Sequence, residues 1–151
     1  MFGIVPFVKM AGRGLGKILK GKDGEKALKK EVEDLGLAKD DIDIHVDEDG
    51  KVSVKGKGIS QEMKEKIILA VGNVEGVGEV EDGIESDGDT PPSEFHTVVS
   101  GDTLWAISKR YYSKGSRYKE IFEANRPMLK HPDKIYVGQV LRIPADRTEA
   151  V

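Results

Sequence analysis

Residues 95–144 read FHTVVSGDTLWAISKRYYSKGSRYKEIFEANRPMLKHPDKIYVGQVLRIP. Phe95–Val99 is rich in aromatic and β-branched residues and predicts a strand, which Ser100–Thr103 breaks with residues suited to cap a helix. Apolar and aromatic side chains then recur at helical spacing in two runs, Leu104, Ile107 and Tyr111, and Tyr118, Ile121 and Phe122. Val140–Ile143 predicts a last strand, which Pro144 ends. Two strands that bracket two helices can bury one sheet face, so this segment predicts a small α+β unit.

Three segments of this unit occur in the order that is typical of LysM domains: HTVVSGDTLWAISKRY, FEANRPML and IYVGQVLRIP. The unit therefore resembles a LysM domain with the order βααβ. The resemblance implies binding of glycans that contain N-acetylglucosamine, such as peptidoglycan or chitin. It places the glycan-binding residues in the loops after the first strand and before the last, at Gly101, Asp102, Thr103, Leu104, Asn125 and Ile135. The single tryptophan, Trp105, is suited either to stacking on a sugar ring or a partner domain, or to packing at the edge of the core.

Charge, cysteine content and hydropathy exclude several classes of protein. The chain has 24 basic and 27 acidic residues and a formal net charge of −3, whereas nucleic-acid-binding proteins normally show a clear basic excess. It contains no cysteine, which excludes disulfides and thiolate metal sites. No apolar run approaches the roughly twenty residues that cross a bilayer. We therefore predict no nucleic-acid partner and no transmembrane segment.

The N-terminal residues do not follow the order of a secretory signal, in which positive charge precedes the apolar core. Here the apolar run 2–8 comes first and the basic residues begin at Lys9. We therefore expect a cytoplasmic protein, which conflicts with binding of peptidoglycan outside the cytoplasm. Apolar residues between positions 8 and 19 also have helical spacing, interrupted by glycines. We expect this segment to pack on the unit that follows, with an amphipathic helix at a membrane surface as the alternative.

Residues 25–85 predict a second α+β unit. Its predicted elements are a helix over 28–35, strands over 42–46 and 52–54, a helix over 60–72 and a strand over 79–84. Gly36 is expected to end the first helix, and Ser60 to cap the second. Gly56 and Gly58 are expected to end the second strand. The predicted order is αββαβ.

That order, together with HVDEDGKVSVKGKGISQEMKEKIILAVGNVEGVGEVEDGI, resembles a BON domain. The shared features are the hairpin, the glycine after its second strand, and the short helix that leads through a glycine-rich turn into the last strand. The whole chain is therefore predicted as α+β with two small domains joined by a Pro/Gly-rich linker. The predicted divisions are an N-terminal segment (1–24) packed on the BON domain (25–85), the linker (86–94), the LysM domain (95–144) and a tail (145–151).

Candidate catalytic and divalent-metal residues lack the spacing that their chemistry needs. The three histidines, His45, His96 and His131, have no partner at metal-ligand spacing. The acidic run 47–49 fits an EF-hand loop only with His45 at its first position and Gly56 at its last, where acidic ligands are required. It therefore predicts a solvated hairpin turn. No serine has the context of a nucleophile, and we predict that the protein is not an enzyme.

The turn Gly72–Gly78, GNVEGVG, follows the end of the second predicted helix. A helix leaves its last carbonyls without intrahelical partners, and this end carries partial negative charge. Three glycines allow the backbone to fold so that several carbonyls converge. Backbone carbonyls can replace the water around a potassium ion. The alternative interpretation is an ordinary turn that ends a helix.

The full arrangement resembles the bacterial potassium-binding protein (Kbp) family. The matching segments are FVKMAG, GISQEMKEKIILAVGNVEGV and FEANRPMLKHPDKIYVGQVLRIP. The resemblance implies a cytosolic protein that binds K+ through main-chain oxygens and becomes compact on binding. On this chain it implies carbonyl ligands from the N-terminal segment and from the glycine-rich turn, at Val8, Ala11, Arg13, Gly72, Val74 and Val77.

Two further hypotheses remain open at this point. One is a peptidoglycan-binding envelope protein that acts through its LysM domain. The other is a stress-related interaction module without a ligand of its own. If the protein is instead a K+ sensor or buffer, as the Kbp resemblance implies, we expect a monomer in which the BON and LysM domains dock on each other.

Overall fold

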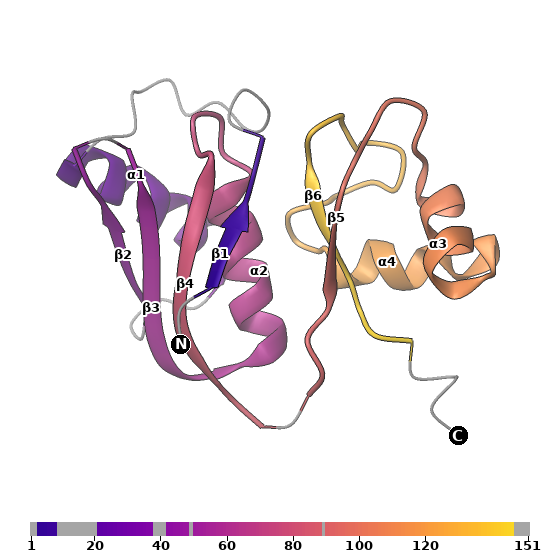
Figure 1. Cartoon of the computed structure of the whole chain (residues 1–151), viewed down its shortest axis with the longest axis horizontal. Helices are drawn as coiled ribbons and strands as arrows, with labels where there is room; N and C mark the ends of the chain where they lie inside the picture. Colours follow the sequence, from indigo (N-terminus) through magenta and orange to yellow (C-terminus); the bar gives the residue numbers. More distant parts are fainter. Residues whose placement is uncertain (1–2, 9–20, 38–41, 49, 89, 147–151) are drawn as a thin grey trace.

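The chain folds into two units, each built from a sheet and helices (Figure 1). The computed structural model describes residues 3–8, 21–37, 42–48, 50–88 and 90–146. The first unit contains β1 (Gly3–Pro6), α1 (Gly21–Asp34), β2 (Ile42–Val46), β3 (Val52–Ser60), α2 (Gln61–Gly72) and β4 (Glu79–Asp87). The second contains β5 (Glu94–Thr97), α3 (Leu104–Tyr112), the 3-10 helix η1 (Gly115–Arg117), α4 (Tyr118–Ala124) and β6 (Val140–Ile143). The predicted α+β class is confirmed. No helix within the described ranges is long and apolar enough to cross a bilayer.

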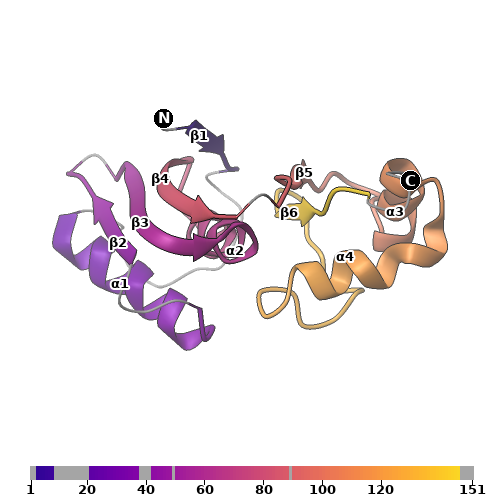
Figure 2. The same cartoon turned by 90° about the horizontal axis from the view of Figure 1, so that it is seen from below.

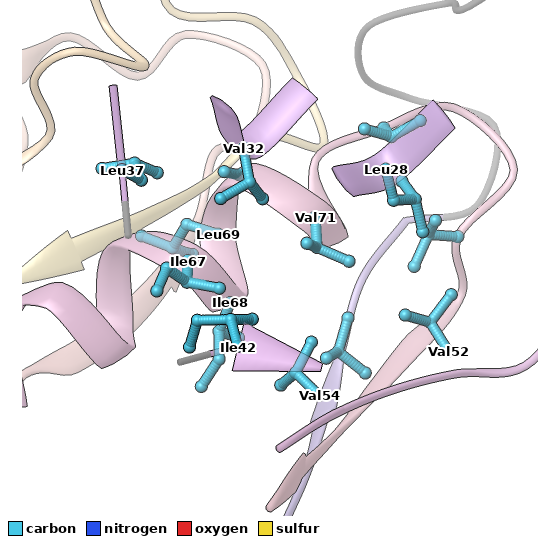
Figure 3. Packing of buried hydrophobic residues seen from close by; sticks show 14 of the residues in the cluster. Leu28, Val32, Leu37, Ile42, Val52, Val54, Ile67, Ile68, Leu69 and Val71 are labelled. Atoms are coloured by element: carbon cyan, nitrogen blue, oxygen red, sulfur yellow. The ribbon is translucent and has the colours of Figure 1, made fainter. Parts of the chain in front are cut away.

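The first unit has a four-stranded sheet in the order β1-β4-β3-β2. The pair β3–β4 is parallel because α2 crosses over between them, and the two outer pairs are antiparallel. Figure 2 shows α1 and α2 on the same side of this sheet. The core fills the space between them. Figure 3 shows Leu28 and Val32 of α1 with Ile67 and Val71 of α2, and all four are at most 2% exposed.

The first helix ends as the sequence predicts. Gly36 has the left-handed φ of 73°, which a glycine adopts without steric cost. The Leu37 N–H donates to the Val32 carbonyl at 3.1 Å, and the Gly36 N–H donates to the Glu33 carbonyl at 2.9 Å. This pair of bonds is the Schellman arrangement, which satisfies carbonyls that a helix end leaves open. The prediction that Gly36 ends this helix is confirmed.

The prediction that Gly56 and Gly58 end the second strand of the hairpin is wrong. β3 continues to Ser60, because β4 offers a parallel partner beyond the glycines. Gly56 pairs with Ile84 and Ile59 pairs with Ser86, with a register shift between them. Gly58, at a φ of 69°, takes up that irregularity. Glycine in a strand here marks a bulge rather than an end.

The N-terminal residues add an edge strand that the sequence did not predict. β1 pairs antiparallel with β4, from Gly3 opposite Asp82 to Pro6 opposite Glu79. Pro6 is tolerated because it stands at the end of an edge strand. The remainder of the apolar run with helical spacing, beyond Val8, lies outside the described residues.

The second unit encloses its own core between a two-stranded sheet and its helices. β5 and β6 pair antiparallel, with His96 opposite Leu141. Thr103 caps α3 by accepting a hydrogen bond from the Ala106 N–H at 3.0 Å. The buried core residues are Val98, Leu104, Ile107, Tyr112, Ile121, Leu129, Leu141 and Ile143. The predicted order βααβ is confirmed, and the last strand has the predicted bounds.

A buried ion pair joins the two units. The Arg142 guanidinium of β6 lies 2.8 Å from the Glu65 carboxylate of α2, with side chains only 8% and 3% exposed. The same guanidinium donates to the Ala124 carbonyl at 2.9 Å and to the Ser93 hydroxyl at 3.2 Å. Glu65 also accepts from Gln61 and from the Ser93 N–H. Burial alone would raise the pKa of Glu65, but the hydrogen bonds from Gln61, Ser93 and Arg142 outweigh it and lower the pKa.

Glu65→Gln should destabilise the protein near neutral pH by roughly 3–5 kcal/mol, because it leaves a buried guanidinium without its counter-charge. A lowered folded-state pKa means that the Glu65 carboxylate stabilises the fold above its unfolded-state pKa of about 4.3. This contribution is lost as the pH falls through the lower folded-state pKa. The difference in unfolding free energy between wild type and Glu65→Gln should therefore shrink below about pH 4. Urea denaturation at a series of pH values measures it.

Glu62→Gln is the matched control on the same helix. The Glu62 side chain is 58% exposed and pairs with Lys66, so its loss should cost below about 1 kcal/mol. A wild-type to Glu65→Gln difference that stays constant down to about pH 3 would contradict a buried Glu65 that is ionised in the folded protein.

Candidate functional site

The turn after α2 is anchored by two buried valines. Val74 and Val77 are 1% and 0% exposed, so their side chains hold the turn in the core of the first unit. The Val77 N–H donates to the Val74 carbonyl at 3.1 Å, and Gly76 between them has a φ of 102°. A carbonyl oxygen has two lone pairs, so Val74 keeps acceptor capacity after this bond. The turn is thus fixed by its side chains while its backbone carries the polar groups.

The N-terminal strand meets this turn through Phe7. The Phe7 N–H donates to the Gly78 carbonyl at 3.0 Å. The Phe7 ring covers Gly72 so closely that a Cβ atom built on Gly72 would clash with Cζ, Cε1 and Cε2 of that ring. The close approach of Phe7 to α2 therefore requires glycine at position 72. Through Phe7, the N-terminal segment contacts both ends of the turn, Gly72 and Gly78.

The residues predicted as K+ ligands fall into two groups. Gly72, Val74 and Val77 lie in the turn itself. Val8 directly follows Phe7, which contacts the turn, and is 44% exposed. The other two predicted ligands, Ala11 and Arg13, lie outside the described residues.

The chemistry of this region is that of main-chain oxygens. Among the described residues, no group of three or more His, Cys, Asp or Glu side chains is placed to hold a metal ion. A hard divalent ion is held by carboxylates in proteins, whereas a monovalent cation is served by carbonyl dipoles. α2 directs its C-terminal end, with its partial negative charge, at the start of the turn. Main-chain carbonyls at such a helix end are groups that a weakly hydrated monovalent cation can use.

Asn73 links the same turn to the second unit, which the sequence did not predict. Its side-chain amide donates to the Val140 carbonyl at 2.8 Å, and its side-chain oxygen accepts from the Val140 N–H at 2.9 Å. Val140 belongs to the core of the first unit although it lies in β6. No sequence signal identifies such a contact, because the two residues lie 67 positions apart.

A separate groove lies in the second unit, where the LysM resemblance places glycan-binding residues. Its volume is about 410 Å³, and four predicted residues line it, Asp102, Thr103, Leu104 and Ile135. The other lining residues are Trp105, Tyr118, Pro132 and Asp133. The Val99 N–H and then His96 donate hydrogen bonds to Asp102, which lower the pKa of its carboxyl group. An ionised Asp102 at the groove is suited to accept hydrogen bonds from sugar hydroxyls.

Two predicted glycan-binding residues are not part of this groove. Asn125 is 2% exposed, and its amide bonds to the backbone of Ile121 and Arg142, so its role is to join α4 to β6. Gly101 precedes the groove in a turn at a φ of 92°. The LysM resemblance placed Asn125 among the exposed loop residues, but it does not reveal that the Asn125 amide bonds to the backbone of α4 and β6.

Trp105 is an exposed aromatic side chain at the groove. It is 56% exposed, and its ring covers Gly115 so closely that a Cβ atom there would clash. The Tyr118 ring lies 6.0 Å away between centroids, at an interplanar angle of 43°. Trp105 is thus an exposed aromatic side chain whose ring packs on the backbone of Gly115. Gly115 carries the signal for this placement, since a larger residue would displace the ring.

Comparison with known proteins agrees with this architecture. The BON domain family matches residues 23–88, and the LysM domain family matches residues 96–144. The potassium binding protein Kbp of Escherichia coli O6:H1 is 46% identical to this chain over 149 residues, which cover 95% of this chain and 99% of that protein. The chain belongs to the Kbp family. The resemblance to Kbp, BON and LysM that the sequence motifs carried is confirmed.

A shorter similarity connects the chain to a second protein. An uncharacterized protein of Deinococcus radiodurans is 42% identical over 60 residues. These residues make up 40% of this chain and 21% of that protein. The similarity to Kbp, by contrast, spans both units and the region between them.

Gly72→Ala should destabilise the protein, because the new methyl group must displace the Phe7 ring. Overpacking of this kind costs about 1–3 kcal/mol. At an unobstructed position in a helix, the same change stabilises by about 1 kcal/mol. Destabilisation would therefore indicate a clash with Phe7, and stabilisation would indicate open space at Gly72. Urea denaturation measures it. Gly3→Ala is the control, since a Cβ atom there meets nothing within 4 Å.

The double variant Phe7→Leu with Gly72→Ala separates this contact from other effects. If Phe7 is the obstacle, the two changes should be non-additive, and the smaller side chain should recover part of the loss. A Gly72→Ala variant that is as stable as wild type, or more stable, would contradict the close packing of Phe7 on the turn.

Proposed function

We propose that this member of the Kbp family binds potassium ions and acts as a K+ sensor or buffer. The observation that carries the proposal is its similarity, over almost the full length of both chains, to a protein named for potassium binding. The structure supports it with a turn rich in main-chain oxygens at the end of α2, which the N-terminal strand approaches closely. Both observations concern a binding protein and require no catalytic group.

The proposed ligands are main-chain carbonyl oxygens from two segments. Gly72, Val74 and Val77 supply those of the turn, and Val8, Ala11 and Arg13 supply those of the N-terminal segment. The contact between Phe7 and Gly72 supports this pairing, because it brings the two segments together. Carbonyl dipoles suit K+ because they replace its hydration shell without the high cost of desolvating carboxylates.

Ion binding would order the N-terminal segment on the turn and favour the docked arrangement of the BON and LysM domains. A ligand shifts such an equilibrium only by its differential affinity for the two states. The carbonyls of two segments provide that difference, since they are correctly placed only when the segments meet. We propose that the protein acts as a monomer in the cytoplasm, where potassium is the main cation.

Calorimetric titration of the dialysed protein with KCl, NaCl and CaCl2 at matched ionic strength tests the proposal. We expect saturable heat with KCl and little with NaCl, together with a smaller radius of gyration in X-ray scattering when KCl is present. A titration without saturation by KCl would contradict the proposal. Saturation by CaCl2 alone would instead point to carboxylate ligands.

Gly76→Ala should weaken the K+ response at the turn. Gly76 has a φ of 102°, and a side chain in this region costs about 1–3 kcal/mol, or roughly tenfold in affinity if the turn relaxes to avoid it. Gly88→Ala is the matched control, because Gly88 has a φ of 88°, lies outside the turn and has open space around its Cβ position. Equal KCl affinities for the two variants would place the ion elsewhere.

Glycan binding by the LysM groove is a second candidate function. The exposed Trp105 beside Asp102, in a groove of about 410 Å³, is the observation that favours it. Wild type should then sediment with purified peptidoglycan and Trp105→Ala should not, while the KCl titration stays unchanged. Equal sedimentation of both proteins, or none, would contradict this candidate. Flat titrations with both ions and glycans would favour an interaction module without a ligand.

A further inference from the structure

One side chain belongs to both the proposed ion site and the interface between the two units. Asn73 follows Gly72 at the C-terminal end of α2, and its backbone N–H donates to the Leu69 carbonyl at 2.9 Å. Its backbone is therefore part of the turn. Its side chain forms two hydrogen bonds with Val140 of β6, at 2.8 and 2.9 Å. A change in the backbone of the turn therefore moves the Asn73 amide and alters its hydrogen bonds to Val140 of β6.

The pairing occupies a free edge of the small sheet in the LysM domain. β6 pairs with β5 on one side only. Successive residues of a strand direct their backbone N–H and C=O groups to opposite edges, so Val140 and Arg142, two positions apart, present theirs at the same edge. The Asn125 amide pairs with Arg142 from within the LysM domain. Asn73 makes the equivalent pairing with Val140 from the BON domain.

The amide of asparagine has the chemistry that this pairing requires. It donates through nitrogen and accepts through oxygen, which matches the backbone carbonyl and N–H of a single residue. Aspartate has no donor, and alanine has neither group. Two residues further along β6, Arg142 enters the buried pair with Glu65. β6 is thus held to α2 at two points, and only the point at Asn73 lies in the turn.

We propose that Asn73 is the positioning residue that couples ion binding in the turn to docking of the LysM domain. This inference rests on the proposed function. An ion that orders the carbonyls of Gly72 and Val74 fixes the backbone of the residue between them, and so fixes the direction of the Asn73 amide. The reverse also holds, because β6 orients Asn73 and thereby pre-orders the turn. Linkage requires that the two effects be equal in free energy.

Amide NMR of the full chain during a KCl titration tests the coupling. In wild type, the signals of Val77 in the turn and Val140 in β6 should follow one saturation curve. In Asn73→Ala, Val77 should still saturate, but at a K+ concentration about fivefold or more higher. The Val140 signal of this variant should stay constant over the titration.

Glu75→Ala is the matched control, because Glu75 is an exposed residue of the same turn. Its loss removes one negative charge, yet Val77 and Val140 should still titrate together. Asn73→Ser provides a second variant if Asn73→Ala does not fold, since its hydroxyl group is too short to span to Val140. The same separation of the two signals is expected for it.

The outcomes distinguish the coupling from the ion site. A Val140 signal that still follows Val77 in both Asn73 variants would overturn the role of Asn73. So would a wild-type titration in which Val77 responds and Val140 does not. A wild-type titration in which neither signal responds would overturn the proposed ion site itself, and with it the coupling.

Discussion

The buried charge of Arg142 is the constraint on which the arrangement of the two units depends. A guanidinium that is excluded from water must have its donors satisfied, and breaking a buried pair is strongly destabilising. Its partners come from three places: Glu65 in α2, Ser93 in the connection between the units, and Ala124 at the end of α4. Few relative positions of the units satisfy all three. The ion pair therefore allows fewer relative positions of the two units than apolar contact alone would. Val140 adds apolar burial to the same interface.

α2 transmits this constraint to the proposed ion site. The helix carries Glu65 in its first half and ends at the turn that contains Asn73. It is buried over nearly all of its second half, because the sheet covers one side and the LysM domain approaches the other. Its end is therefore held from two directions, by Phe7 of the N-terminal segment on Gly72 and by Val140 on Asn73. A turn held in this way loses less conformational freedom when it binds an ion, which favours binding.

Local chemistry allowed most of the fold to be predicted from the sequence. Gly36, Ser60 and Thr103 act on their own helix ends, so their roles follow from neighbours in the chain. Features that depend on distant partners were not predictable. β3 continues past Gly58 only because β4 lies beside it, and β1 forms only because β4 has a free edge. Sequence motifs pointed to the glycine-rich turn and to the four residues that line the LysM groove. They did not show the contacts that Asn73 and the buried Asn125 make with β6, because those partners are distant in the chain.

The proposed function depends above all on where the ion binds. Crystals grown with thallium(I) in place of potassium would give an anomalous signal that identifies the site directly. We predict a peak within coordination distance of the carbonyl oxygens of Gly72, Val74 and Val77 and of main-chain oxygens in the N-terminal segment, without a carboxylate ligand. A peak held by the side chains of Asp47 or Glu48 in the hairpin turn, or no peak at the end of α2, would contradict the account.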